Sequence, residues 1–256
     1  ICVDANDDGV MELLVFATGT SSENPRAELY SFGTGKRELI GETRLDSTIT
    51  SFESIKYAKT DEGTSIYADA LCADGSSMVT EFIYWSDYYN SIISPFYSYS
   101  TGRTKETLRS SQVTCRDIDD DGYIEIPEDT SSKKQSSEIT SQNWVNYGNT
   151  VLSHKCYSFS CKRDGYILVI DDDDFSKVKA NYDSESRKLT IINKKNKSNV
   201  FEIVTLINSN YSVNDPKYKD YTMIMKNSGF VYLAKVNKSS DIDINIQTLK
   251  DMIKVY

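Results

Sequence analysis

The sequence predicts a mainly β protein with a smaller α+β part at its C-terminal end. Composition favours strands, because the 256 residues include 18 tyrosines and many Ser, Thr and Val but only four prolines. Short runs of β-forming residues recur along the chain, separated by turns rich in Asp, Asn, Gly and Ser. In the last residues, apolar side chains recur at three- and four-residue steps from Ile246 to Tyr256. This spacing indicates an amphipathic helix capped near Asn245.

The N-terminal part is expected to form strands joined by tight turns. Gly33 and Gly35 lie between two predicted strands and mark a hairpin, and Asp74-Gly75 is a second hairpin signal. Residues 127–141 are polar and low in apolar content, so we expect an exposed flexible loop there. The predicted strands span residues 12–18, 26–33, 36–45, 50–59, 65–72, 77–86 and 90–98.

The chain changes character after residue 158. Residues 144–158 are expected to form one or two further strands, and residues 165–170 (GYILVI) are a continuous apolar run. The four aspartates 171–174 that follow repel one another and lack the alternation that would aim their oxygens at one point, so they indicate a solvated turn. Further strands are predicted at 187–193, 200–207, 220–226 and 229–236. We therefore expect two domains, residues 1–158 and 159–256.

Two nine-residue segments repeat one pattern of oxygen-bearing residues: 4–12 (DANDDGVME) and 117–125 (DIDDDGYIE). Oxygen-bearing side chains occupy relative positions 1, 3 and 5, glycine occupies position 6, and a carboxylate occupies position 9. The residue at position 7 offers its backbone carbonyl, and glycine permits the sharp turn that wraps a hard cation. The predicted metal ligands are Asp4, Asn6, Asp8, Val10 and Glu12 in the first loop and Asp117, Asp119, Asp121, Tyr123 and Glu125 in the second.

The ligand set favours calcium. Calcium accepts about six to eight oxygen ligands, and each loop offers about five, to which water can add. Magnesium requires a stricter octahedron, and the absence of Cys and His from the ligand positions argues against zinc or copper. Val15 stands where an EF-hand has an acid, and Pro127 argues against a helix after the second loop, so each loop is expected between two strands. For one loop taken alone, an Asp/Gly-rich turn without metal is the alternative.

Both loops resemble the FG-GAP or VCBS class of repeat, which builds blades of β-propellers in extracellular proteins and in integrin α-subunits. The likeness extends to Cys2 and Cys115, which each stand two residues before the first ligand and are expected to be buried strand positions. The resemblance implies partial β-propeller blades in residues 1–158 and a structural role for the calcium ions.

The C-terminal part resembles a module that follows propeller-like repeats in lipoproteins of gut Firmicutes and, more distantly, the PsbP-type α/β/α sandwich. The likeness is carried by residues 164–171 (DGYILVID), 181–193 (NYDSESRKLTIIN) and 229–236 (GFVYLAKV) with the final helix. Phe175 stands where the pattern has a tryptophan. The resemblance implies a small α/β sandwich domain and carries no residue-level chemistry.

The expected location is extracellular or anchored at the cell surface. The chain begins with Ile1 rather than Met, so we expect a signal or lipid anchor upstream of it. No run approaches the roughly 18 apolar residues of a membrane span, and a net charge of −9 argues against nucleic acid or an anionic membrane as partner. The five cysteines cannot all pair within the chain, and a bridge between Cys156 and Cys161 is left open.

A non-catalytic protein is expected. His154 is the single histidine, and nothing near it in the sequence supplies an orienting group or an oxyanion loop. The chain also lacks GxSxG, Walker A, GxGxxG and HExxH patterns. The expected role is binding or scaffolding at the cell envelope, with a protein or glycan as ligand.

Two alternatives stay open. The first alternative to a binding or scaffolding protein is a carbohydrate-binding accessory module of an extracellular glycan-processing system, and the second is part of a hydrolase whose active site lies upstream of Ile1. For the first alternative, aromatic faces that stack on sugars are available in one segment, although ordinary strand core explains them as well. These residues are Tyr84, Trp85, Tyr88, Tyr89, Phe96, Tyr97 and Tyr99.

Overall fold

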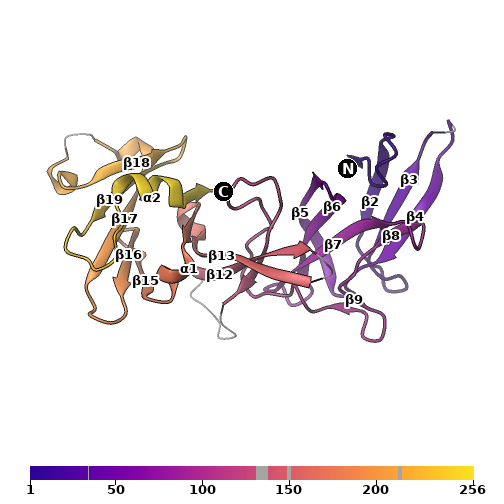
Figure 1. Ribbon diagram of the computed structural model, residues 1–256, viewed down its shortest axis with the longest axis horizontal. Helices are drawn as coiled ribbons and strands as arrows, with labels where there is room; N and C mark the ends of the chain where they lie inside the picture. The colour runs from indigo at the N-terminus through magenta and orange to yellow at the C-terminus, as the bar shows by residue number, and fades with distance from the viewer. Residues whose placement is uncertain (34, 131–137, 149–150, 213–214) are drawn as a thin grey trace. The chain divides into compact units, whose positions relative to one another are not determined.

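The computed structural model describes residues 1–33, 35–130, 138–148, 151–212 and 215–256 (Figure 1). Strands dominate the described residues, which confirms the predicted mainly β class. The chain divides into two compact units, the first comprising Ile1–Asp129 with Trp144–Lys155 and the second Thr130–Asn143 with Cys156–Tyr256. The predicted boundary at residue 158 lies in strand β13 (Val151–Cys161), which contributes residues to both units.

The first unit contains two four-stranded antiparallel sheets in which each strand pairs with the next along the chain (Figure 1). One sheet consists of β1 (Cys2–Val3), β2 (Glu12–Ala17), β3 (Arg26–Ser31) and β4 (Glu38–Arg44). The other consists of β5 (Ile49–Thr60), β6 (Gly63–Cys72), β7 (Met78–Ser86) and β8 (Ser91–Ile93). A short pair, β9 (Tyr97–Ser98) and β10 (Arg103–Thr104), follows.

The strands of the second sheet bury apolar side chains on both faces. Neighbouring residues of a strand point to opposite faces, and in β6 Ile66 packs in one apolar cluster while Tyr67 packs in another. Strand β7 repeats this division with Ile83 and Phe82. The first cluster also takes side chains from β1, β2 and β3, so it joins the two sheets. The second cluster is completed by Cys115, Ile124, Ile126 and Val145.

The second unit is built around a five-stranded antiparallel sheet with the order β15-β16-β17-β19-β18. Its strands are β15 (Val178–Asp183), β16 (Lys188–Asn193), β17 (Asn199–Ile207), β18 (Thr222–Lys226) and β19 (Phe230–Val236). A further sheet, whose strands come from both units, has the order β11 (Ile126–Asp129), β12 (Thr140–Gly148), β13, β14 (Tyr166–Ile170) and β20 (Ile253–Val255). The α-helices are α1 (Asp172–Phe175) and α2 (Ile246–Met252), and short 3-10 turns span Lys162–Asp164, Asn208–Asn210 and Pro216–Tyr218.

The predicted C-terminal helix is confirmed at its start and wrong at its end. The Asn245 side chain accepts hydrogen bonds from the backbone N–H groups of Gln247 and Thr248 at 2.8 and 3.1 Å, which is an N-cap. The helix ends at Met252, because Ile253 and the two residues after it pair with β14 instead. Of the four aspartates, Asp171 is the N-cap of the one-turn helix α1 and the other three lie within it, with Asp174 partly buried.

Several other expectations need correction. The polar loop predicted at 127–141 is wrong at both ends, where β11 and β12 are strands that neighbour each other in one sheet; residues 131–137 lie outside the described residues. The single strand predicted at 90–98 is divided into β8 and β9, because a turn closes between Ser94 and Tyr97. All five cysteines are free thiols, and Cys156 and Cys161 lie on the same strand, β13.

Candidate metal centres

Each predicted metal loop lies between two antiparallel segments. The first loop, residues 4–12, joins β1 to β2, and Val3 is the cross-strand partner of Glu12. The second loop, residues 117–125, is closed by an isolated β-bridge between Arg116 and Glu125 and continues into β11. In both loops, the carboxylate residue at position 9 therefore pairs with the residue that precedes position 1.

The backbone follows the same path in the two loops. Positions 4 and 6 have positive φ in both: Asp7 at 58° and Gly9 at 86°, Asp120 at 63° and Gly122 at 90°. Asp tolerates the left-handed region better than most residues, and glycine enters it at little cost. A Cβ at either glycine would meet no atom within 4 Å, so conformation rather than crowding explains glycine here.

Three hydrogen bonds also recur at equivalent positions. The carboxylate at position 9 accepts from the backbone N–H at position 2, at 3.0 Å in both loops. The carboxylate at position 1 accepts from the glycine N–H at 3.2 Å in the first loop and 2.9 Å in the second. The carboxylate at position 5 accepts from the N–H at position 7 at 2.7 and 2.9 Å. The two loops therefore have the same local structure.

The second loop brings three carboxylates together. One oxygen from each of Asp117, Asp119 and Glu125 lies within 4.8 Å of the others, so the cluster is able to hold a metal ion. Glu125 is fully buried, and its Oε1 has no hydrogen-bond partner among the residues that the structure describes. A buried carboxylate oxygen without a partner is destabilising unless a proton or a cation neutralises the charge. The residues therefore fit a bound cation.

The first loop offers a related but less acidic set. Asn6 stands at position 3, where the second loop has Asp119, and its side chain contacts Asp8. Within the described part of the chain, the Oδ1 atom of Asp4 is buried without a hydrogen-bond partner, as Glu125 Oε1 is in the other loop. Glu12 is buried, whereas Val10, whose predicted contribution is a backbone carbonyl, is 44% exposed.

Electrostatics in both loops favour a cation. Burial and, to a smaller extent, the charges of Asp119, Asp121 and Asp117 raise the pKa of Glu125 to about 7. Burial also raises the pKa of Glu12, with a contribution from neighbouring Asp8 and Asp4. A bound divalent ion would reverse these shifts, because its charge favours the ionised carboxylates.

A lysine from a neighbouring strand contacts each loop. Lys155 of β13 lies 2.5 Å from Asp121 and 3.2 Å from Asp119, and its ammonium group lowers the pKa of Asp121. Lys59 of β5 lies 2.8 Å from Asp7 and 3.6 Å from Asp4. Asp121, a predicted ligand, therefore pairs with Lys155 and does not belong to the cluster of Asp117, Asp119 and Glu125. Tyr123, the predicted carbonyl ligand, donates its hydroxyl to Asp61 at 3.0 Å.

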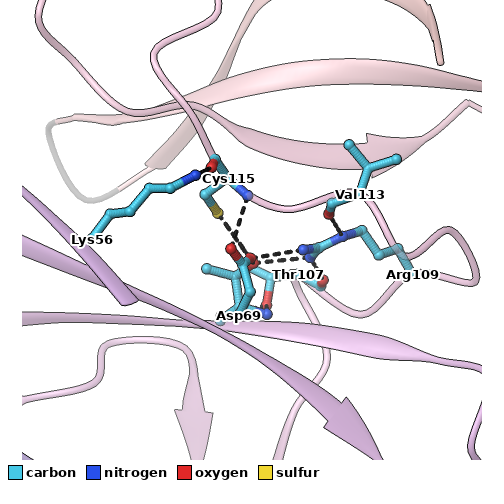
Figure 2. A network of polar contacts seen from close by, with 7 residues as sticks. Lys56, Asp69, Thr107, Arg109, Val113 and Cys115 are labelled. Atoms are coloured by element: carbon cyan, nitrogen blue, oxygen red, sulfur yellow. Dashed lines mark hydrogen bonds and ion pairs between the residues drawn. The ribbon is translucent and has the colours of Figure 1, made fainter. Parts of the chain in front are cut away.

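Figure 2 shows a buried ion pair that fixes the chain ahead of the second loop. Asp69 of β6 and Arg109 lie 2.8 Å apart, and both side chains are at most 1% exposed. Asp69 also accepts from the backbone N–H of Cys115 at 2.9 Å and from its thiol at 3.2 Å. Arg109 donates to the carbonyl of Val113 at 2.9 Å, and Lys56 donates to the carbonyl of Cys115. The network positions the residue two before Asp117.

The two cysteines that precede the loops differ in burial. Cys115 is fully buried, as predicted, but Cys2 is exposed, so the expectation of a buried Cys2 is wrong. The difference arises because Cys115 bonds to Asp69 in the buried network, whereas Cys2 lies in β1, a two-residue strand at the edge of its sheet. Burial, with the nearby Asp69 charge, raises the pKa of the Cys115 thiol well above its ordinary value, which makes it a poor nucleophile.

The predicted aromatic cluster is distributed over several environments. Tyr97 is buried, and Phe96 packs beside the second apolar cluster of the first unit. Tyr88 and Tyr89 are 88% and 66% exposed at the turn between β7 and β8, with their rings edge to face at 4.8 Å. Tyr99 is also exposed, whereas Tyr84 and Trp85 are partly buried.

Sequence reasoning missed four residues that shape the loops: Asp69, Arg109, Lys59 and Lys155. Asp69 could have been found from the sequence. It is the only acid in the apolar run IYADAL, which lacks the alternation of apolar and polar residues typical of a half-exposed strand, so a buried carboxylate is indicated there. The lysines could not have been found in this way, since their pairing with the loops joins distant parts of the chain.

Comparison of the chain with protein-family models, with curated proteins and with solved structures found no match. No helix among the described residues has the length and apolar character needed to cross a membrane.

Proposed function

We propose that the protein is a calcium-stabilised, non-catalytic binding or scaffolding protein of the extracellular space or cell surface. The observation that carries the proposal is Glu125: its buried Oε1 has no hydrogen-bond partner among the described residues, and one of its carboxylate oxygens lies within 4.8 Å of oxygens of Asp117 and Asp119. The first loop repeats the backbone path and the hydrogen bonds of the second. Each loop would hold one ion through its carboxylates and a backbone carbonyl, and in the first loop Asn6 would be a further ligand.

Calcium suits the ligands better than other common metals. All predicted ligand atoms are oxygens, which excludes the thiolate and imidazole sets preferred by zinc and copper. A flexible loop with exposed positions tolerates the irregular coordination of calcium more readily than the strict octahedron of magnesium. Calcium sites of extracellular modules have Kd values of about 10⁻⁴ to 10⁻³ M, and two loops of this modest charge fit that range.

The structural role follows from where the loops lie. An ion in the first loop would tie β1 to β2, and an ion in the second would secure the turn that leads into β11. The two four-stranded meanders of the first unit have the strand order of FG-GAP-like propeller blades, which supports that interpretation. In the second unit, helix α2 beside an antiparallel sheet supports a small α/β sandwich.

Calorimetric titration of the metal-free protein tests the proposal. We expect calcium to bind at two sites per chain, and magnesium at the same concentration to bind more weakly. Glu125→Gln and Glu12→Gln should each remove one site. Asp120→Asn, at a non-ligand position with positive φ that Asn tolerates, is the control and should retain both. Absence of calcium binding at millimolar concentration would refute the proposal.

A further inference from the structure

A cavity of about 410 Å³ lies within the first unit, beside the first metal loop. Its walls come from four places: the first loop, the turn between β5 and β6, the end of β7, and β12. Its volume falls within the range of about 300–1,000 Å³ that is typical of small-molecule sites. Of its lining residues, the proposed calcium role uses only Asn6 as a ligand.

Aromatic rings and carboxylates line this cavity together. Tyr84, Trp85 and Tyr147 are lining residues; the rings of Tyr84 and Tyr147 lie 6.3 Å apart between centroids, and Trp85 follows Tyr84 in β7 and packs beside the other apolar cluster. The indole N–H of Trp85 donates to Asp87 at 3.1 Å, which fixes the orientation of the ring beside a carboxylate. Asp87 is itself a lining residue.

The charge of the lining is one-sided. Asp7, Glu62 and Asp87 carry carboxylates there, and the lining contains no Lys, Arg or His. Lys59 pairs with Asp7 at 2.8 Å, but neither Glu62 nor Asp87 forms an ion pair with any residue that the structure describes. A second cavity of about 400 Å³ gives the contrast, because its lining balances Glu23 and Glu42 with two arginines.

From this lining, we infer that the cavity beside the first loop binds an organic cation: an ammonium or guanidinium group on an apolar stem. Carboxylates only accept hydrogen bonds, so they match a ligand head that only donates. Aromatic faces attract cations and also pack against the stem. A neutral sugar both donates and accepts hydrogen bonds, so it also needs donors in the lining. Two such donors, the amide of Asn6 and the hydroxyl of Thr64, are already bonded to Asp8 and Asp7.

The ligand chemistry has two possible sources, a free polyamine or the side chain of a partner protein. Spermidine represents the first source and N-acetyl-arginine amide the second. N-acetyl-norleucine amide supplies a stem without a charge, and maltose tests the sugar alternative. Each is titrated into the full chain with saturating calcium, and binding is followed by NMR. The chain has two tryptophans, and Trp144 is fully buried, so a shift confined to the Trp85 indole N–H locates the site.

We expect at least one cation to shift the Trp85 signal and the neutral probes to leave it unchanged. The double variant Glu62→Gln/Asp87→Asn should weaken binding about tenfold, because two carboxylates are lost while the acceptor for the indole is kept. Glu38→Gln/Glu53→Gln removes the same charge at exposed positions outside the lining and should bind as the parent does. Unchanged thermal unfolding of the variants excludes misfolding as the cause.

The inference rests on the proposed function only through Asn6 and Asp7, which belong to the first loop. Repeating the titration in EGTA separates the two claims. Cation binding in calcium supports the inference whether or not EGTA weakens it, and it does so even if calorimetry finds fewer than two calcium sites. The inference is overturned if neither cation shifts the Trp85 signal, if maltose or the norleucine derivative binds equally well, or if the two double variants behave alike.

Discussion

Glu12 and Glu125 hold the same place in two distant parts of the chain. Each is buried, each accepts a 3.0 Å hydrogen bond from the second residue of its loop, and each pairs across strands with the residue before the loop. One carboxylate oxygen is thereby used to close the loop. The other oxygen would remain for the proposed cation, and in Glu125 it has no hydrogen-bond partner among the described residues.

Glu125→Gln should change stability in opposite directions with and without calcium. In EGTA at about pH 8, the parent buries a carboxylate whose pKa is raised to about 7, and the neutral amide avoids that charge. We expect the variant to be more stable than the parent by about 1–3 kcal/mol under these conditions. In excess calcium the order should reverse, because the variant has lost a ligand.

Urea unfolding at both conditions measures this reversal. The Asp120→Asn control should follow the parent in each buffer. A variant that is less stable than the parent in both buffers would show that Glu125 has a purely structural partner rather than a metal.

Lys155→Gln should tighten calcium binding at the second loop. The Lys155 ammonium group contacts Asp119 and Asp121, two predicted ligands, and therefore competes with a cation. Its removal should increase affinity about five- to tenfold. Lys59→Gln is the matched change at the first loop and should have a smaller effect, because Lys59 is 60% exposed. Calorimetry that finds weaker binding after Lys155→Gln would mean that the lysine orients the ligands.

Asp69→Ala should destabilise the first unit strongly. The substitution leaves Arg109 buried without its charge partner and removes the acceptor for Cys115. Breaking a buried pair in this way costs about 3–5 kcal/mol. The same variant should weaken calcium binding at the second loop more than at the first, because the network fixes only the second. A loss below about 1 kcal/mol, or equal weakening of both sites, would contradict this role.

Glu81 should make stability depend on pH independently of the loops. It is fully buried in β7, and burial raises its pKa from 4.5 to about 7, although Ser94, Thr104 and the Asp46 N–H donate to it. The native state then binds more protons than the unfolded state between these values. The contribution of Glu81 to stability is therefore greatest below about pH 4.5 and is lost as pH rises through about 7, a change of up to about 3 kcal/mol.

Glu81→Gln should flatten that decline. Urea unfolding across this pH range in saturating calcium isolates the effect, since the loop carboxylates are then ionised throughout. Glu38→Gln, an exposed acid, should leave the pH profile unchanged. An identical decline in parent and Glu81→Gln proteins would disprove the assignment.

The strands and metal loops were accessible from sequence because their signals are local. Turn residues such as Asp74 and Gly75 limit each strand, and the ligand spacing recurs within nine residues. Strand β20 was missed, since Ile253 continues a helical pattern and joins β14 only through long-range pairing. Strand β15 was missed as well.

The buried polar residues were harder to predict. Asp69 and Glu81 each interrupt an apolar strand, which indicates a buried acid but not its partner. Arg109 lies in a segment with little regular structure, and only the fold brings it to Asp69. The same limit applies to the cavity lining, which combines four separate parts of the chain.

Thermal unfolding in EGTA and in excess calcium tests the central claim most directly. An ion that binds only the native state stabilises it by about 1.4 kcal/mol for each site at roughly tenfold excess over Kd. Two sites should therefore raise the unfolding midpoint by about 5–10 °C, and the Glu12→Gln/Glu125→Gln double variant should lose this rise. An unfolding midpoint that is the same in EGTA and in calcium would contradict the account.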